Sequence, residues 1–308
     1  MNWLARLFSP RKSEAPPAVP AAVPAARNAP ASAPTSGPDT PPADAGAFLP
    51  WLLQGPPLRP GPVSDTEQRA LHALDKVLAL PVLPDELLPR AAALIPQLLA
   101  MLRQSDLPVP ALAQRVAKDV VLTAEVLRLA SSPYYRAQAA VTDLQQAIAL
   151  IGVAGLQAVI ARVVLKPMFE AAPGPLSARA GARLWEHAEA LAAHTAEQAT
   201  AAGTQPFDGY LAGLLHGSGW TIALRALDRA RLDLPMPCSE SFALAAADRA
   251  HRLFGQAAQR WTITPAFSAF GTDARQRALA ASRDPLAAAL RAAQPAALAA
   301  LSSEQPAP

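Results

Sequence analysis

The sequence of 308 residues predicts an all-α fold, a multi-helix bundle in two helical halves that follows a disordered arm rich in Pro and Ala. Three observations predict this fold class. Ala and Leu dominate the chain after residue 62, and aromatic residues make up only 5% of it, whereas strands favour β-branched and aromatic residues. Helix-capping motifs open several apolar segments. The first half contains no pair of alternating strands joined by a hairpin turn.

Proline divides the chain into domains. Of the 33 prolines, 15 fall within the first 62 residues. Residues 15–62 are therefore predicted to form a disordered Pro/Ala-rich linker, because most of this segment has too few large apolar side chains to offset the entropy of ordering. It follows a short amphipathic segment at 1–14. An extension helix at 63–79, a main domain at 80–282, and a C-terminal helix and tail at 283–308 complete the organisation.

Two short apolar stretches stand out in this N-terminal region. Residues 1–14 place Trp3, Leu4, Leu7 and Phe8 at helical spacing beside basic residues, so a membrane-surface or partner contact is one hypothesis, and a frayed terminus without function is the alternative. Residues 48–53 form an apolar island between prolines. We expect this island to pack back onto the following domain, with a short docking motif as the alternative.

The first predicted helices are defined by caps and prolines. Ser64 and Glu67 form a capping box that opens a helix, and Pro81 with Pro84 ends it. A second helix is predicted over residues 85–104, with a kink at Pro96. A short helix follows at 109–119.

The helices predicted for the middle of the chain are also defined by capping residues and by a glycine. Asp119 is expected to cap the helix that starts at Val120, and Thr142 with Gln145 to cap another that Gly152 closes. A strongly apolar helix then continues to Lys166 in the core, while Tyr134 and Tyr135 are expected to be packing residues.

The remaining helices carry the histidines. A helix over 177–202 holds His187 and His194, and a helix over 207–216 ends at His216, followed by a loop with glycines at 217 and 219. Helices at 221–230 and 240–260 come next, the latter with His251. Two shorter helices finish the chain. The glycines are expected to serve close helix packing and a left-handed turn rather than a phosphate cradle.

Charge and cysteine content exclude several classes of function. The formal charge of +3 comes from scattered arginines, without the clustered basic residues and stacking aromatics typical of nucleic-acid binding. The single cysteine, Cys238, forms no internal disulfide and no thiolate zinc cluster, which fits a reducing, cytoplasmic setting. No run of about 18 uncharged apolar residues is present, so no membrane span is predicted.

A family resemblance rests on the tract from Leu80 to Phe270. Its most specific part runs from Asp119 to Leu150, where the order of "VLRLASSPYY", "VTDLQQAIAL" and the following "IG" matches the bacterial HDOD pattern. "LWEHA" and "YLAGLLHGSGW" follow. The chain therefore resembles the HDOD domain, or HD-related output domain, an all-helical relative of the HD-type metal phosphohydrolases.

The resemblance assigns positions of a former metal site. It implies that His187 corresponds to the first histidine of HD-type proteins, His216 to the histidine of the HD dyad, and Gly217 to the dyad aspartate. His251 resembles a later motif position. A hard divalent cation needs oxygen ligands. Since glycine supplies none, no metal, cofactor or catalytic residue is predicted.

The histidines also have plain structural interpretations. His187 and His216 are expected to be buried neutral imidazoles, each bonded to a backbone carbonyl or hydroxyl, or else to line a retained polar pocket for a small ligand. His251 is expected to be a capping or surface residue. The resemblance implies a non-catalytic signalling scaffold that binds signalling proteins not identified by sequence, with residual phosphohydrolase activity and a membrane-tethered adaptor as alternatives. The oligomeric state is left open.

Overall fold

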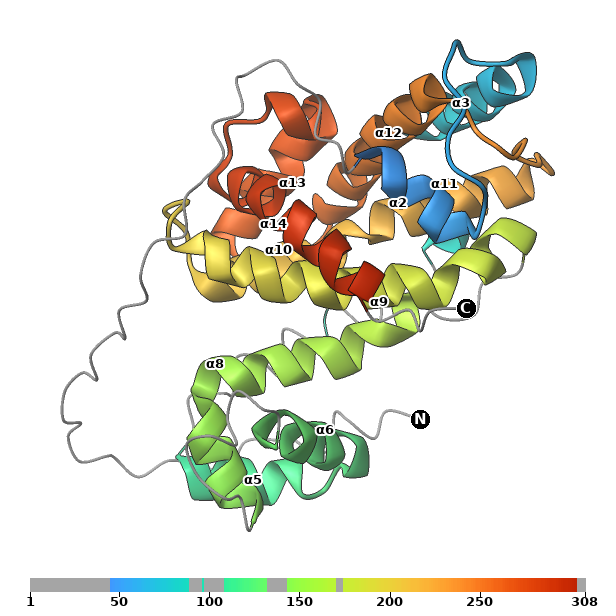
Figure 1. Ribbon diagram of the computed structural model, residues 1–308. Coiled ribbons are helices and arrows are strands. Elements are labelled where there is room, and N and C mark those ends of the chain that lie inside the picture. Colours follow the sequence, from blue (N-terminus) through green and yellow to red (C-terminus); the bar gives the residue numbers. More distant parts are fainter. Residues whose placement is uncertain (1–44, 89–95, 97–107, 132–142, 170–173, 304–308) are drawn as a thin grey trace.

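The computed structural model describes residues 45–88, 96, 108–131, 143–169 and 174–303, and within them the chain is helical with no strand, as predicted. Figure 1 shows two halves. The smaller half contains α5 (Val109–Val116), α6 (Val120–Ala130) and the first part of α8 (Leu144–Leu165). The predictions for residues 1–14, for Pro96 as a kink within a continuous helix, and for Tyr134 and Tyr135 lie outside the described residues.

The larger half is built around α9 (Pro175–Ala199), along which α10 and α14 pack. Its other helices are α2 (Ala45–Leu53), α3 (Asp65–Leu78), α10 (Pro206–His216), α11 (Ser218–Arg229), α12 (Glu240–Ala258), α13 (Pro265–Gln276) and α14 (Pro285–Ser303). Short 3-10 helices occur at η1 (Asp85–Leu87), η2 (Lys166–Met168) and η3 (Leu279–Ala281). α14 buries Leu286 and Leu290, so the C-terminal helix belongs to the core.

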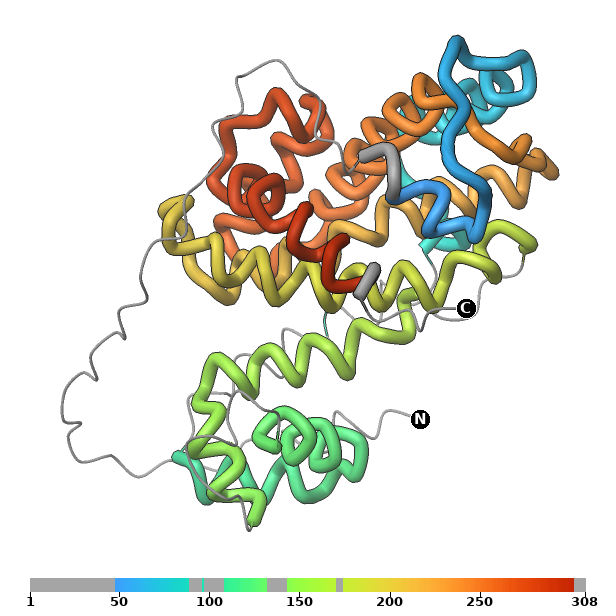
Figure 2. The backbone as a smooth tube through the Cα atoms, in the orientation of Figure 1, coloured from blue at the N-terminus to red at the C-terminus, as the bar shows by residue number. Residues whose placement is uncertain are grey.

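Helix α8 links the two halves and bends at Gly152. Figure 2 shows the backbone of this helix changing direction. Gly152 has φ 67° and ψ −176°, a conformation that glycine adopts without a Cβ penalty. The prediction that Gly152 closes one helix and a second follows is confirmed. Asp143 caps the helix by accepting the Gln146 N–H at 2.8 Å, while the predicted cap residue Thr142 lies outside the described residues.

The stretch Leu144–Met168 is long and apolar enough to cross a membrane by length and composition alone. Half of its most apolar window is nevertheless buried inside the protein, against α6, α5 and α10. This burial is what a core helix shows, and it agrees with the central position predicted for the apolar segment.

The apolar island at 48–53 lies on α2, which packs against α9 and α12. Phe48, Leu49, Leu52 and Leu53 are buried. The expectation that the island packs back onto the domain is therefore confirmed, while the assignment of residues 45–62 to a disordered linker is wrong. Four large apolar side chains within six residues give this segment enough burial to offset its ordering entropy.

A buried carboxylate connects the N-terminal extension to the main domain. The capping box of Ser64 and Glu67 is present as predicted, but Glu67 also reaches α12. Its carboxylate accepts the Ser64 N–H (2.6 Å), the Ser239 N–H (2.6 Å), the Ser239 hydroxyl (3.0 Å) and the Arg59 guanidinium (2.8 Å). Burial alone would raise the pKa of Glu67, but the hydrogen bonds from Ser64 and Ser239 hold it below its usual value.

Residues 80–88 form an extended segment on the surface of the larger half. Three side chains hold its backbone: Gln256 donates to the Leu80 carbonyl (2.6 Å), Arg260 to that of Leu83 (3.3 Å) and Arg225 to that of Leu87 (3.2 Å). These bonds hold main-chain atoms, and the buried side chains of Leu83, Leu87 and Leu88 also contribute apolar contacts that fix the segment.

The helix predicted to begin at Asp85 does not begin there. Residues 85–87 form the 3-10 turn η1, and Leu88 leaves the helical conformation with φ −140° and ψ 65°. The physical reason is Pro89, since the ring of a proline disfavours the α conformation in the residue before it.

Replacing Glu67 with alanine should destabilise the protein by about 3 kcal/mol, because the buried N–H groups of Ser64 and Ser239 and the Arg59 charge lose their partner. Urea unfolding followed by circular dichroism measures the change. Asp75→Ala is the control, because the Asp75 pair with Arg249 is partly exposed and should be worth less than about 1 kcal/mol. Equal losses in the two variants would contradict the anchoring role of Glu67.

Candidate functional site

Three histidines from three helices lie in the interior of the larger half. His216 ends α10 and His251 lies in the middle of α12, with the His216 Nε2 and His251 Nδ1 atoms 3.0 Å apart. One imidazole donates to the other, and the tautomers decide which. His187 of α9 is the third, and α9 packs along α10 so closely that a Cβ atom at Gly217, next to His216, would lie 3.9 Å from the Cβ atom of Ala188, next to His187. The structure thus groups all the histidines that the resemblance assigned to the former metal site.

The prediction that His251 is a capping or surface residue is wrong. Its side chain is buried, with 2% exposed, and its ring lies 6.1 Å from the Phe270 ring, measured between centroids. His251 shares an apolar stripe of α12 with Ala247, Phe254 and Ala258 at helical spacing. That stripe was a signal for burial that the sequence already contained.

His187 is covered by helix α2. The rings of Phe48 and His187 have centroids 4.6 Å apart, and the Trp51 ring lies 6.3 Å from the same imidazole. Neither ring nitrogen of His187 has a hydrogen-bond partner among the described residues. The expected burial of His187 and His216 is observed, but the expected carbonyl or hydroxyl partners are not, since His187 has none and His216 bonds to an imidazole.

The junction after His216 is not the glycine loop expected from the sequence. Gly217 adopts a right-handed helical conformation (φ −59°, ψ −18°), and α11 begins at the next residue. The expected left-handed turn is therefore wrong at this position. Close packing is confirmed for Gly219, where a Cβ atom would stand 2.0 Å from the Ala250 carbonyl oxygen, and for Gly213, where it would stand 2.6 Å from the Ala192 Cα.

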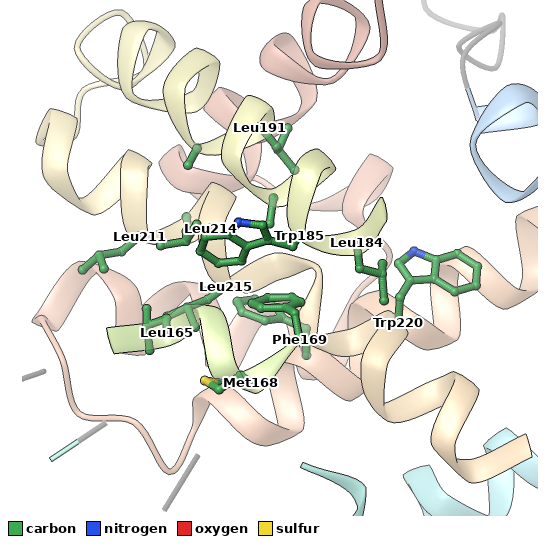
Figure 3. Packing of buried hydrophobic residues seen from close by; sticks show 14 of the residues in the cluster. Leu165, Met168, Phe169, Leu184, Trp185, Leu191, Leu211, Leu214, Leu215 and Trp220 are labelled. Carbon is green, nitrogen blue, oxygen red and sulfur yellow. The ribbon is translucent and has the colours of Figure 1, made fainter. Parts of the chain in front are cut away.

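An aromatic side chain crowds the position of the missing aspartate. A Cβ atom at Gly217 would lie 3.3 Å from Cε1 of Phe169, a contact tight enough to require movement. Figure 3 shows Phe169 next to Trp185, and their ring centroids are 5.5 Å apart. Phe169 has only 2% of its surface exposed, so it has little room to withdraw.

The other acidic and imidazole groups near this region have separate roles. His194 lies on the outside of α9, 3.2 Å from Glu197. Asp208 accepts a hydrogen bond from the Thr264 hydroxyl (2.6 Å), and Thr264 in turn caps α13 by accepting from the Phe267 N–H. In the part of the chain that the structure describes, no group of three His, Cys, Asp or Glu side chains is placed to hold a metal ion.

Burial sets the electrostatics of the three imidazoles. It lowers the pKa of His187 to about 3, with a smaller contribution from His216, and lowers the pKa of His216 to about 3, with a contribution from His251. The pKa of His251 falls to about 4 through burial and the nearby Arg291. All three are neutral at physiological pH.

These residues do not fit a divalent metal of the kind used by phosphohydrolases. Hard cations require carboxylate or other oxygen ligands, and among the described residues no set of three His, Cys, Asp or Glu side chains is placed to supply them. The two imidazoles that meet are joined to each other by a hydrogen bond, and the third is covered by an aromatic ring. The arrangement can form a packed core with neutral rings, and no step of metal-assisted hydrolysis follows from it.

Comparison with solved structures supports the fold. The chain is similar to a crystal structure from Shewanella amazonensis SB2B, provisionally described as a metal-dependent phosphohydrolase, with a TM-score of 0.54, 16% identity, and coverage of 79% of this chain and 86% of that one. It is also similar to an HDOD domain protein of unknown function from Geobacter sulfurreducens, with a TM-score of 0.43, 22% identity, and coverage of 66% and 68%. At these identities the likeness concerns the fold alone. No curated protein matches the chain.

The family assignment comes from the sequence model of the HDOD domain, which matches residues 88–262. This range covers more than half of the chain and includes α5 to α12, together with His187, His216 and His251. The chain therefore belongs to the HDOD domain family.

Proposed function

We propose that this protein is a non-catalytic bacterial regulatory module that acts by binding other proteins in the cytoplasm. The observation that carries the proposal is the filling of the former metal site by the chain's own aromatic residues. Phe48 covers His187 at 4.6 Å between ring centroids, and Phe169 crowds the position of the dyad aspartate. A phosphodiester substrate would need access to both of these positions.

Helix α2 is held over His187 firmly enough to act as a permanent cover. Burial of Phe48, Leu49, Leu52 and Leu53 is worth roughly 1.5–3 kcal/mol for each side chain. The Leu53 carbonyl also accepts a hydrogen bond from Arg179 at 3.3 Å, and the Trp51 carbonyl accepts one from Arg183. The summed free energy of these contacts exceeds the binding free energy of a weakly bound substrate, so α2 keeps substrates away from the histidines.

The alternatives receive less support. Residual phosphohydrolase activity would require α2 and Phe169 to move and a carboxylate to be supplied from elsewhere. Membrane attachment through Trp3, Leu4, Leu7 and Phe8 concerns residues outside the described part of the chain. A module that acts through its surface needs neither a metal site nor a membrane anchor. The family's relationship to HD-type enzymes then reflects a shared fold.

The purified protein should show no Mn²⁺-dependent or Mg²⁺-dependent hydrolysis of bis(p-nitrophenyl) phosphate, and metal analysis after dialysis should find substoichiometric metal. Gly217→Asp should not change either result, because the new carboxylate meets Phe169 and lacks ligand partners. The same variant should unfold at a lower urea concentration than the wild type.

Stoichiometric Mn²⁺ together with hydrolysis that His187→Leu abolishes would overturn the non-catalytic assignment. The binding half of the proposal is tested separately by crosslinking the tagged full chain in cells of its own source and identifying the captured proteins by mass spectrometry. The same tag on an unrelated helical protein is the control. Failure to enrich any protein above that control would count against an interaction role.

His187→Leu should be at least as stable as the wild type at pH 7.5, because the substitution removes two buried ring nitrogens without hydrogen-bond partners. Its advantage should grow as the pH falls. An unfolded histidine gains a proton near pH 6.5, whereas buried His187 stays neutral down to a pKa of about 3, so the wild type loses stability below pH 6.5. At pH 5 the added difference is about 2 kcal/mol.

Urea unfolding at pH 7.5, 6 and 5 measures this dependence. His194→Leu is the matched control for replacing a histidine of α9 with leucine, since His194 is partly exposed. A loss of several kcal/mol in His187→Leu at pH 7.5 would show that this imidazole has a polar role that its surroundings do not explain.

A further inference from the structure

A groove separate from the histidines runs between helices α3 and α11, at the end of the larger half where Figure 1 labels α3. It encloses about 610 Å³. Its lining residues come from the exposed side of α3 and from the last turn of α11 and the residues after it: Gln68, Arg69, His72, Ala73, Lys76, Val77, Ala226, Ala230 and Leu232. None of these positions belongs to the former metal site.

The α3 wall carries a row of basic side chains. Arg69, His72 and Lys76 are all exposed and occupy positions i, i+3 and i+7 of the helix. With a rise of about 1.5 Å per residue, their Cα atoms are separated by roughly 4.5 and 6 Å along the helix axis. The row therefore follows the groove for roughly 10 Å instead of converging on one point.

These basic groups have no acidic partner within the described residues. Arg69 donates to the Thr66 hydroxyl at 3.1 Å, and no ion pair involves His72 or Lys76 there. The carboxylate next to Lys76 in sequence, Asp75, is engaged by Arg249 through two hydrogen bonds of 2.8 and 2.9 Å. The basic side chains on the α3 side of the groove are therefore available to bind an acidic ligand.

The floor of the groove is apolar and made of small side chains. Ala73, Val77, Ala226, Ala230 and Leu232 contribute to it. Alanine lets another backbone approach closely, as in helix-on-helix packing, while Val77 and Leu232 offer apolar contact.

We propose that this groove binds an acidic amphipathic helix of a partner protein. The apolar face of the partner would lie on the alanine floor, and carboxylates at i, i+3 or i+4, and i+7 would face Arg69, His72 and Lys76. This inference rests on the proposed interaction function and names its site and the chemistry of its partner.

Two features favour a helix over a small phosphate-bearing ligand. A phosphate is held by donors that converge on it, whereas these basic groups are spread over successive turns of α3. The groove is also open along its length and floored by apolar side chains, which match the anchors of a helix better than a hydrated anion.

The test measures fluorescence anisotropy of the full chain with a labelled 18-residue helical probe, whose glutamates line one edge of a Leu/Ala face. A second probe has glutamine in place of each glutamate. The acidic probe should bind, the glutamine probe should bind about tenfold more weakly, and added salt should weaken only the acidic probe.

Two variants locate the binding site. Arg69→Glu with Lys76→Glu should weaken the acidic probe by about tenfold or more, and Ala73→Trp should weaken both probes by filling the floor. The matched control is Lys118→Glu with Arg283→Glu, which makes the same charge change at exposed positions outside the groove. This control should bind as the wild type does, and unchanged circular dichroism confirms that each variant is folded.

Several outcomes would overturn the proposal. Binding of the acidic probe that the groove variants leave unchanged, or no binding at all, would do so. Equal loss in the control variant would indicate a general charge effect. Equally tight binding of a labelled single-stranded oligonucleotide, lost in the same groove variants, would identify a polyanion site instead. Partner capture that survives Arg69→Glu with Lys76→Glu would leave the interaction function intact and reject this groove alone, whereas failure to capture any protein above the control would count against the interaction function itself.

Discussion

The contact between Phe48 and His187 is the constraint around which this structure is organised. The positions that the resemblance assigns to an HD-type site lie inside the helical bundle, and a closely packed interior leaves little empty space there. Both ring nitrogens of His187 stay without a hydrogen-bond partner among the described residues. Aromatic rings approach these positions from two directions, with Phe48 from α2 against His187 and Phe169 beside Gly217. The positions that the family resemblance assigns to a metal site are thus packed against the chain's own aromatic side chains.

That packing explains the architecture of the N-terminal extension. Helix α2 covers His187 only if the chain between α2 and α3 is fixed, and the buried Glu67 carboxylate fixes it by joining Arg59 and Ser64 to Ser239. The extension is therefore part of the larger half and not an appendage to it. Its outer surface, on α3, is where the unpaired basic row lies.

The three histidines lie at the positions that the family resemblance assigns to them, among aromatic rings of the core. Burial keeps them neutral, and the bond between His216 and His251 satisfies one nitrogen of each ring. Each buried imidazole opposes folding once the pH falls below about 6.5, because the unfolded chain accepts the proton that the folded chain refuses.

The sequence alone determined the helical class, most helix positions and the absence of the dyad aspartate, because capping residues, prolines and apolar periodicity act over a few neighbouring residues. Ser64, Asp119 and Gly152 are examples. Only the tertiary structure decided what replaces the missing ligand, because Phe48 and His187 are far apart in the chain and no local pattern joins them. It also decided the second role of Glu67, whose partner Ser239 lies 172 residues away. Contacts at such separation depend on how helices pack, and a pattern read within one helix does not contain that information.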